Sequence, residues 1–577
     1  MKKDAMSRRG FVTSLAALGM ATVGLAGCAP KETSSPAADP ALSSTGGSLP
    51  QKWDMEADVV ILGGGGAGVA AACTAKEAGA SVLVLEKANV IGGDTALSGQ
   101  SMLGPWPEQQ KAVAGIDDSI EEYIADMKNS YKWGAFAEQG REFPAEYPFT
   151  QLQCDLTPDM MEWTSDVIGV GWAPSGTADD PVTEGVLPQP TWDTKNCRTW
   201  MAMNPENSVM TAFGAACDSM GVDIRLRTEA DRLIVDSGGR VVGVYAYDEN
   251  DELIAVKAAK AVVVATGSFS GNRGMMERYL PITKGIQGGG CYGVTGDGMR
   301  MIRAIGGSLS EMDLGVHWYP FEAGTNSGQF STTLILFGGS EGKVPGSQQP
   351  GIMLNYDGER FVSESNGYHL IGRATAQQPC QEAWYVFDSH PGVPDLILHA
   401  IPYNNRVVQA DTVEELCTIL RLPADTVKEQ IAAYNASIEA GSDEAFGKLL
   451  DGCAPIDQGP FYALNIRPRP YATYGGVDTD LEARVLDAQG QVIPGLYAAG
   501  IVTGSYAARE GFYYNGGLAQ ALIFGRLAGK NAAADEAWEE AQPTGAESER
   551  QDVMTVVSCT DCHGDNRAPG EPNYHNF

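Results

Sequence analysis

Positively charged residues are scarce in this chain. Its 577 residues include 40 Lys and Arg against 73 Asp and Glu, which gives a formal net charge of −33 and a pI of about 4.5. The acidic residues are spread along the sequence, so the charge marks no single site. A surface of this sign repels nucleic acid and anionic lipid headgroups, and the composition therefore excludes both as electrostatic partners. The hydrophobic fraction of 43% is ordinary and is sufficient for several globular domains.

A hydrophobic run long enough to cross a membrane is missing at the N-terminus. The apolar stretch Phe11–Leu25 falls short of the ~20 strongly apolar residues that a spanning helix takes. It follows Ser7-Arg8-Arg9-Gly10-Phe11-Val12, which has the form of a twin-arginine export motif. It ends in Leu25-Ala26-Gly27-Cys28, which resembles the lipobox of bacterial lipoproteins. We therefore expect residues 1–28 to be an export signal.

The predicted signal indicates where the protein is located. Cys28 would become the lipidated N-terminus, and a simple cleaved signal with an incidental cysteine is the alternative. Residues 29–55 begin with a stretch rich in Ser, Pro, Ala, Thr and Gly and would form a flexible tether. We expect a protein that is exported by the twin-arginine route and anchored to the outer side of the bacterial cell membrane. The lipid anchor would be its only membrane contact.

Paired cysteines are also nearly absent. Apart from Cys28 and the pair Cys559/Cys562, the other cysteines lie far apart, with no C-x-x-C among them. These are Cys73, Cys154, Cys197, Cys217, Cys291, Cys380, Cys417 and Cys453. Export permits disulfides, but this spacing indicates none in particular.

One motif near the C-terminus does carry paired cysteines. Cys559-Thr560-Asp561-Cys562-His563 has the C-x-x-C-H form by which c-type haem is attached, since two thioether bonds need both cysteines and His563 ligates the iron. His575 is a candidate second axial ligand, with an exposed tail histidine as the alternative. A zinc site made by the same cysteines and histidines is the competing interpretation of the motif. We expect residues 541–577 to be a linker and a tail with one haem c.

The segment 58–87 has the pattern of a complete dinucleotide-binding unit. Asp58–Leu62 is a short apolar and β-branched run, which is typical of a buried parallel strand. Val69–Ala78 is an Ala-rich helix whose N-terminus offers free N–H groups and a partial positive charge to phosphates. Ser81–Leu85 is the second strand. The order strand, turn, helix, strand predicts a nucleotide site at the turn.

Three glycines and one acidic residue complete this unit. Gly63, Gly65 and Gly68 fall on G-x-G-x-x-G, where they permit a sharp turn, close approach to a pyrophosphate and close packing of the helix on the strand. Glu86 ends the second strand, where a ribose hydroxyl needs an acceptor. Because all four features agree, we predict a bound dinucleotide rather than a glycine-rich turn without a ligand.

Further motifs follow in a fixed order over roughly residues 55–535: DVVILGGGGAGVAAA, EKANVIGGDTALSGQSM, AVVVATGSFSGN, TGDGMRM, GIMLNYDGERFVSE, VIPGLYAAG and IFGRLAGKNAA. They resemble the flavoprotein subunits of fumarate reductase and succinate dehydrogenase, with their relatives the 3-ketosteroid dehydrogenases and urocanate reductases. The resemblance implies an α/β fold. A Rossmann-type FAD-binding domain would comprise residues 56–316 and 470–540, with an inserted α+β capping domain at residues 317–469.

The same resemblance implies that the bound dinucleotide is FAD, held without a covalent bond. The residues that would contact it are Gly63, Gly65, Gly66, Ala67, Gly68, Glu86, Lys87, Gly93, Asp94, Thr95, Ser98, Gly99, Ala230, Thr266, Gly267, Asp297, Gly500, Gly517 and Leu518. Substrate and flavin are expected to meet between the two domains.

The residues with which fumarate reductases bind a dicarboxylate are missing at the matching positions. The family uses arginines and histidines there, because paired guanidinium–carboxylate contacts are strong and oriented. Here the H-T-M-G-G motif reads Ala472-Thr473-Tyr474-Gly475-Gly476, and Tyr368 stands in place of an arginine. The proton-donating arginine falls near Gly392, and the N-R-L-G-G-N motif is replaced by residues 511–517. The resemblance therefore predicts a substrate other than a simple dicarboxylate.

Aromatic residues stand at these positions instead. Tyr513 and Tyr514 resemble the tyrosines of ketosteroid dehydrogenases, whose phenols polarise a ketone and pass protons. Tyr368 and His317, the latter near the family's A-H-P motif, are further candidates for catalysis. For each aromatic residue the alternative is a packing role. Arg509 is the candidate that could replace the missing guanidinium groups.

These observations lead to one expected function and two alternatives. We expect an FAD-dependent oxidoreductase that acts on CH–CH groups and reduces the activated C=C bond of a small enone or enoate by hydride transfer from flavin N5. Electrons would come from a membrane or exported cytochrome through the haem. One alternative is a ketosteroid-type dehydrogenase that runs in the oxidative direction. The other is a non-catalytic FAD and haem module that transfers electrons to a second protein.

Overall fold

The computed structural model describes residues 49–115, 117–129, 131, 134–174, 198–202, 208–322, 351–366, 368–390, 407–450, 453–514 and 516–538. All described residues belong to one compact unit, Ser44–Phe577. The predicted export signal, Cys28 and the predicted haem ligands Cys559, Cys562, His563 and His575 lie outside the described residues. Within the described residues, no helix combines the length and apolarity that a bilayer span requires.

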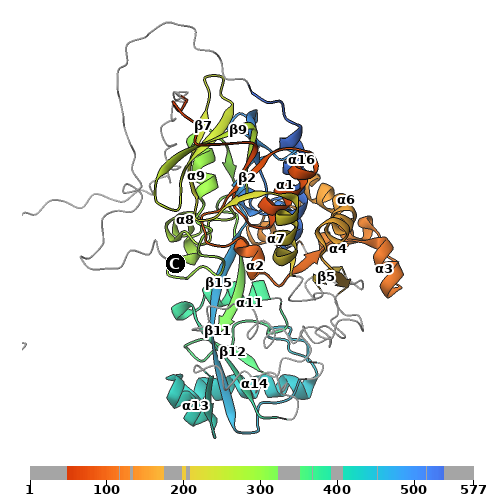
Figure 1. The fold of residues 1–577 in the computed structure, drawn as a ribbon. Helices are drawn as coiled ribbons and strands as arrows, with labels where there is room; N and C mark the ends of the chain where they lie inside the picture. Colours follow the sequence, from red (N-terminus) through yellow and green to blue (C-terminus); the bar gives the residue numbers. More distant parts are fainter. Residues whose placement is uncertain are drawn as a thin grey trace, which may run out of the picture. The chain divides into compact units, whose positions relative to one another are not determined.

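A mixed eight-stranded sheet forms the centre of the FAD-binding segment (Figure 1). Its order is β17 (Arg484–Leu486), β18 (Val492–Ala498), β9 (Leu253–Val264), β1 (Met55–Leu62), β2 (Val82–Leu85) and β6 (Asp223–Arg225). Strands β18, β9, β1, β2 and β6 are parallel, β17 is an antiparallel edge, and β8 (Val241–Tyr247) and β7 (Glu229–Val235) extend the sheet from β9. Nearly continuous Val, Ile and Leu runs suit strands that are buried on both faces. This arrangement confirms the predicted α/β, Rossmann-type fold.

Helices α1 (Gly66–Glu77) and α16 (Gly517–Ala534) lie side by side against this sheet (Figure 1). Their backbones approach closely because α16 carries glycine where the helices meet. A Cβ atom at Gly525 would lie 2.4 Å from the Ala67 carbonyl oxygen, and one at Gly529 would lie 2.2 Å from that of Ala71. The Ala-rich face of α1 is buried in this contact, which explains the small-residue patterns of both helices.

The inserted segment has its own five-stranded antiparallel sheet (Figure 1). The long strand β15 (Phe461–Thr473) pairs with β11 (Val316–Glu322), β13 (Ala383–Asp388) and β14 (Val407–Ala410), and β12 (Ile352–Leu354) pairs with β13. Its helices are α11 (Tyr368–Ala376), α13 (Val413–Leu420) and α14 (Ala424–Ala440). In the predicted division of the chain, β11 leaves the FAD-binding domain and β15 returns to it, so these two strands would connect the two predicted domains.

The remaining elements surround the central sheet. The helices are α2 (Gly93–Leu97), α3 (Pro107–Ala114), α4 (Ile120–Asn129), α5 (Ala135–Glu138), α6 (Pro148–Trp163), α7 (Val209–Met220), α8 (Arg273–Tyr279), α9 (Asp297–Ala304) and α15 (Tyr506–Arg509). Strands β3 (Ser101–Leu103), β5 (Thr199–Ala202) and β4 (Trp172–Pro174) form a small sheet, and β10 (Leu309–Ser310) pairs with β16 (Gly476–Val477).

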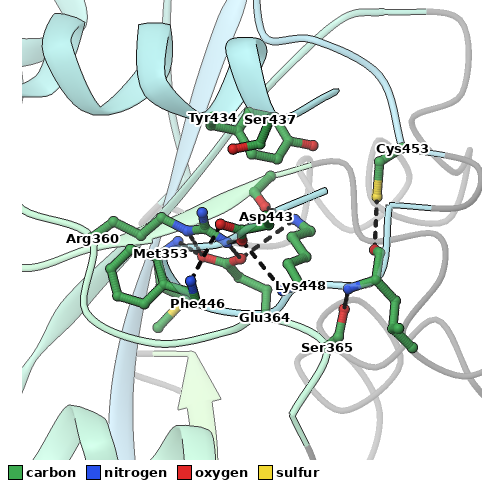
Figure 2. A network of polar contacts seen from close by, with 12 residues as sticks. Met353, Arg360, Glu364, Ser365, Tyr434, Ser437, Asp443, Phe446, Lys448 and Cys453 are labelled. Atoms are coloured by element: carbon green, nitrogen blue, oxygen red, sulfur yellow. Dashed lines mark hydrogen bonds and ion pairs between the residues drawn. The ribbon is translucent and has the colours of Figure 1, made fainter. Parts of the chain in front are cut away.

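Four charged side chains pair inside the inserted segment. Figure 2 shows Arg360, Glu364, Asp443 and Lys448 converging between α14 and the sheet, with each side chain at most 3% exposed. Arg360 donates to Glu364 at 2.7 and 3.0 Å and to Asp443 at 2.7 Å, and Lys448 donates to the Gly351 carbonyl at 2.5 Å. Burial lowers the pKa of Lys448, which the nearby Glu364 opposes. Two cations and two anions balance within this group.

We expect Glu364→Gln to lower the free energy of unfolding by about 3–5 kcal/mol, because it leaves buried cations without their shared anion. Chemical denaturation monitored by circular dichroism measures the change. Glu414→Gln is the matched control, since Glu414 pairs with Lys428 at 3.3 Å on the surface, where Glu414 is 60% exposed. The control should denature as the wild type does. Equal curves for wild type and Glu364→Gln would show that the group does not stabilise the fold.

Candidate active site

The turn between β1 and α1 has the geometry that the glycine motif predicts. Gly63 has a φ of +102°, and a Cβ atom there would lie 2.6 Å from the Ala265 carbonyl oxygen. A Cβ atom at Gly68 would lie 1.9 Å from the Gly63 carbonyl oxygen, so helix and strand approach too closely for any side chain. Gly65 begins the helix without a side-chain cap. The helix N-terminus is therefore open to an anion such as a pyrophosphate.

Glu86 is held at the end of β2, as its predicted role requires. Its carboxylate accepts the backbone N–H groups of Gly64 and Ala88, both at 2.7 Å. The next residue, Lys87, donates to Thr295 Oγ1 at 2.8 Å and to Asp297 Oδ2 at 2.6 Å. Burial alone would raise the pKa of Asp297, but the charge and hydrogen bond of Lys87 hold it below its ordinary value.

Helix α2, which follows β2, contacts the N-terminus of α1. Thr95 Oγ1 accepts the Gly66 N–H at 3.1 Å, and Ser98 donates to the Thr95 carbonyl at 2.7 Å. Asp94 accepts the Cys291 N–H at 2.6 Å. Burial raises the pKa of Asp94 to about 6 despite this bond. Residues that were predicted to contact FAD, and that lie 29 or more residues apart in sequence, thus meet at one end of the sheet.

The other predicted FAD residues lie at strand ends and at helix N-termini. Thr266 Oγ1 accepts the Gly298 N–H at 3.2 Å, and Gly267 has a φ of +77°. A Cβ atom at Gly500 would lie 2.8 Å from the Ala67 Cβ, and one at Gly517 would lie 2.8 Å from the Tyr514 hydroxyl. Ala67 and Leu518 are buried, Gly93 and Ala230 are half-buried, and Gly99 is exposed. The glycine-lined, uncapped helix terminus and the acceptor at Glu86 fit FAD.

Two histidines and five tyrosines meet where β11, β15 and α11 approach the loop before α16. We call this set the aromatic cluster: His317, Tyr319, His369, Tyr471, Tyr474, Tyr513 and Tyr514. The rings of His317 and His369 stack with centroids 4.7 Å apart and planes 23° apart. Tyr514 lies 4.4 Å and Tyr513 5.7 Å from the His317 ring, measured between centroids. The structure thus brings together three residues that the sequence singled out: His317, Tyr513 and Tyr514.

Burial favours the uncharged form of four members of the cluster: His317, Tyr474, Tyr513 and Tyr514. His317 Nδ1 is 3.1 Å from the Tyr474 hydroxyl. Burial, followed by the neighbouring His369, holds the pKa of His317 well below its ordinary value. Burial likewise raises the pKa of Tyr474, Tyr513 and Tyr514. The Tyr513 hydroxyl is buried and has no hydrogen-bond partner among the described residues.

His369 and Glu138 belong to the site, and sequence reasoning missed both. The backbone N–H of Trp318 donates to His369 Nδ1 at 3.2 Å, and His369 Nε2 lies 3.8 Å from Glu138 Oε1. Glu138 is also paired with the guanidinium of Arg373. The one available signal was that His369 immediately follows the substituted position Tyr368. Tyr368 begins α11, but its side chain lies outside the described residues.

Arg509 does not join the cluster. Its guanidinium pairs with Asp478 and donates to Ser310 Oγ at 2.5 Å, to the Thr503 carbonyl at 2.8 Å and to the Val477 carbonyl at 3.2 Å. These bonds hold β16 to β10 and to the segment before α15. The expectation that Arg509 offers a guanidinium to a substrate is corrected, because four protein acceptors already hold the group.

Comparison with known proteins agrees with the geometry of the predicted FAD site. Residues 58–517 match the family model described as FAD binding domain. The chain is 31% identical to a probable fumarate reductase of Shewanella frigidimarina, over 82% of this chain and 74% of that one. It is 28% identical to the digoxin reductase of Eggerthella lenta, over 92% of this chain and 98% of the relative.

A solved structure is also similar. The 3-ketosteroid-Δ4-(5α)-dehydrogenase of Rhodococcus jostii, in complex with 4-androstene-3,17-dione, superposes with a TM-score of 0.64 at 27% identity. The match covers 84% of this chain and 98% of that structure. Together with the glycine turn and Glu86, these similarities confirm the predicted family and FAD as its cofactor. The chain belongs to the FAD-binding family of fumarate reductase-type flavoproteins and is an FAD-dependent oxidoreductase of that type.

Proposed function

We propose that the protein reduces the activated C=C bond of a flat, apolar enone or enoate that binds at the aromatic cluster. Tyr513 carries this proposal, because its hydroxyl is buried and unpartnered among the described residues. A buried polar group without a partner costs about 1–3 kcal/mol, so a ligand oxygen that accepts from it is favoured. A carbonyl conjugated to a C=C bond is such an acceptor, and negative charge builds on its oxygen during reduction.

The residues of the cluster have distinct roles in this proposal. When bound, FAD supplies the hydride from N5 of its reduced ring. Tyr513 donates a hydrogen bond to the carbonyl oxygen and stabilises the charge that develops there. Tyr474 and Tyr514 keep their protons at neutral pH, since burial raises their pKa values, and one of them gives a proton to the α-carbon. Buried aromatic surface around them excludes water and suits a flat substrate.

The charges near the cluster argue against a dicarboxylate. Arg373 is paired with Glu138, and Arg509 is paired with Asp478. Arg469 lies opposite Tyr319 in the register of β15 and β11 and is half-buried, which suits at most one carboxylate. Two carboxylates buried without cationic partners would each lose hydration at a cost of several kcal/mol. One similar structure, a 3-ketosteroid dehydrogenase solved with a steroid dione, supports a larger, ketone-bearing substrate.

We further propose that the chain is exported, lipid-anchored at Cys28 and supplied with electrons through a haem c in its tail. The twin-arginine motif, the lipobox and the C-x-x-C-H motif support this proposal. The electron donor would be a membrane or exported cytochrome.

Expression with a cytochrome c maturation system should yield a haem stain that survives denaturing electrophoresis, because thioether bonds are covalent. Cys559→Ala should lose the stain and the reduction of FAD by an external cytochrome donor, while FAD stays bound. A protein without stain that contains an equimolar amount of zinc would instead establish the zinc site.

A second candidate function runs the same chemistry in the oxidative direction. The likeness to a solved ketosteroid dehydrogenase and the tyrosines of the cluster favour it. Incubation of the protein with reduced methyl viologen and a panel of enones, enoates, steroids and fumarate, followed by mass spectrometry, separates the cases. Addition of two hydrogens to an enone or enoate supports the proposal. Activity only as steroid oxidation with an artificial acceptor supports the dehydrogenase, and no reaction in either direction supports the electron-transfer module.

A further inference from the structure

Glu138 and His369 come from different segments of the chain and meet behind the aromatic cluster. Glu138 ends the short helix α5 in the predicted FAD-binding segment, whereas His369 and Arg373 lie on α11 of the predicted capping segment. The His369 side chain is only 3% exposed and that of Glu138 only 17% exposed. Because Glu138 Oε1 faces both His369 Nε2 and the Arg373 guanidinium, this carboxylate connects the two segments at the site.

The hydrogen bonds of His369 decide which of its nitrogens carries the proton. A backbone N–H can only donate, so Nδ1 must accept from Trp318 and cannot itself be protonated. The ring proton therefore lies on Nε2, the nitrogen that faces Glu138. The Trp318 N–H thus fixes the tautomer, and the Glu138 carboxylate, 3.8 Å from Nε2, attracts the Nε2–H and orients the ring. The uncharged His369 ring then stacks on His317, which in turn contacts the Tyr474 hydroxyl.

We propose that Glu138 is a positioning residue for the reaction: its carboxylate, neutralised by Arg373, attracts the Nε2–H of His369 and so holds the ring, in the tautomer that Trp318 fixes, against His317. This inference rests on the proposed function, because it concerns the acid that reduction of a C=C bond needs. Glu138 touches none of the reacting atoms and acts through His369 and His317.

The charge of Glu138 also affects the pKa values of Tyr513 and Tyr474. The pKa of Tyr513 is raised first by burial and then by Tyr319 and Glu138, and that of Tyr474 first by burial and then by Tyr513 and Glu138. Both effects keep the hydroxyl protons in place, as hydrogen-bond donors and acids require. The titratable and charged groups that face His369 are Glu138, Arg373, His317, Tyr474 and Tyr513.

Three variants test the role of Glu138 in anaerobic reoxidation of the reduced protein by 2-cyclohexen-1-one. Glu138→Ala should lower the limiting rate by about tenfold or more, with FAD content and half-saturation unchanged, because His369 loses the carboxylate that orients its ring. Glu138→Gln should recover most of the rate, since an amide oxygen still faces Nε2–H. Arg373→Gln should also lower the limiting rate, because it removes the cation that holds the Glu138 carboxylate in place.

Glu311→Gln is the matched control. Glu311 pairs at 2.8 Å with Arg141, which lies three residues after Glu138 in the sequence. Glu311 does not belong to the aromatic cluster. It should react as the wild type does. A Glu138→Ala variant as fast as the wild type, or a Glu138→Gln variant as slow as Glu138→Ala, would overturn the inference.

A measurement without substrate separates this inference from the proposed function. Nitrogen-15 NMR of histidine-labelled protein, assigned with His369→Gln, should show the His369 proton on Nε2, because Nδ1 accepts from Trp318. A His369 ring protonated on both nitrogens at neutral pH would overturn the inference, even for a protein that reduces enones. A wild type that no enone or enoate reoxidises would overturn the proposed function alone.

Discussion

Tyr513→Phe should slow the limiting rate of enone reduction by about a hundredfold or more while FAD stays bound. The substitution removes one oxygen and leaves the ring, whose edge packs against His317 with centroids 5.7 Å apart. The hydroxyl has no protein partner among the described residues, so its removal leaves no other described group unpaired. Single-turnover reoxidation at saturating enone, monitored at the flavin absorbance, measures this loss.

Tyr385→Phe is the control for the loss of a buried hydroxyl. The Tyr385 hydroxyl accepts the Gly351 N–H at 2.9 Å within the sheet of the inserted segment, away from the cluster. This variant should be less stable than the wild type and should reoxidise at the same rate. If Tyr513→Phe also kept the wild-type rate, the hydroxyl would not be the donor to the substrate.

Gly68→Ala should deprive the purified protein of most of its FAD. The new Cβ would lie 1.9 Å from the Gly63 carbonyl oxygen, and only a shift of α1 or of the turn could relieve that contact. Either shift moves the open N-terminus of α1 away from the pyrophosphate. The ratio of flavin absorbance to protein absorbance gives the FAD content, and circular dichroism reports whether the variant is folded.

Gly274→Ala is the matched control, because no close backbone contact requires glycine at this position. A Cβ atom there would lie 3.5 Å from Asn272 Oδ1, an ordinary contact, on the exposed face of α8. Its FAD content should equal that of the wild type. A folded Gly68→Ala protein with full FAD content would show that the turn is more adaptable than its geometry indicates.

Local patterns made the FAD-binding half of the protein predictable. Gly63, Gly65 and Gly68 lie within a few residues of the strand and helix that they join, so their spacing alone determines the turn. Glu86 could be placed because β2 must run parallel to β1 for the unit to close. The buried, Val-rich run of β9 was recognisable for the same reason, since a strand covered on both faces needs apolar residues at every position.

The chemical centre was less predictable because it depends on contacts between distant segments. Glu138 lies 231 residues before His369 in the numbering, and no local pattern marks a carboxylate on a four-residue helix as a partner for α11. Arg509 was misplaced for a related reason. Its sequence position beside Tyr513 indicated the site, but Asp478 and Ser310, both distant in sequence, hold its guanidinium elsewhere.

The choice between an enone and a dicarboxylate is the central claim of this account. Anaerobic stopped-flow reoxidation of the reduced wild-type protein, with 2-cyclohexen-1-one and fumarate compared at equal concentration, tests it most directly. The buried aromatic surface of the cluster predicts rapid reoxidation by the enone and very slow reoxidation by fumarate. Rapid reoxidation by fumarate with little reaction of the enone would contradict the account.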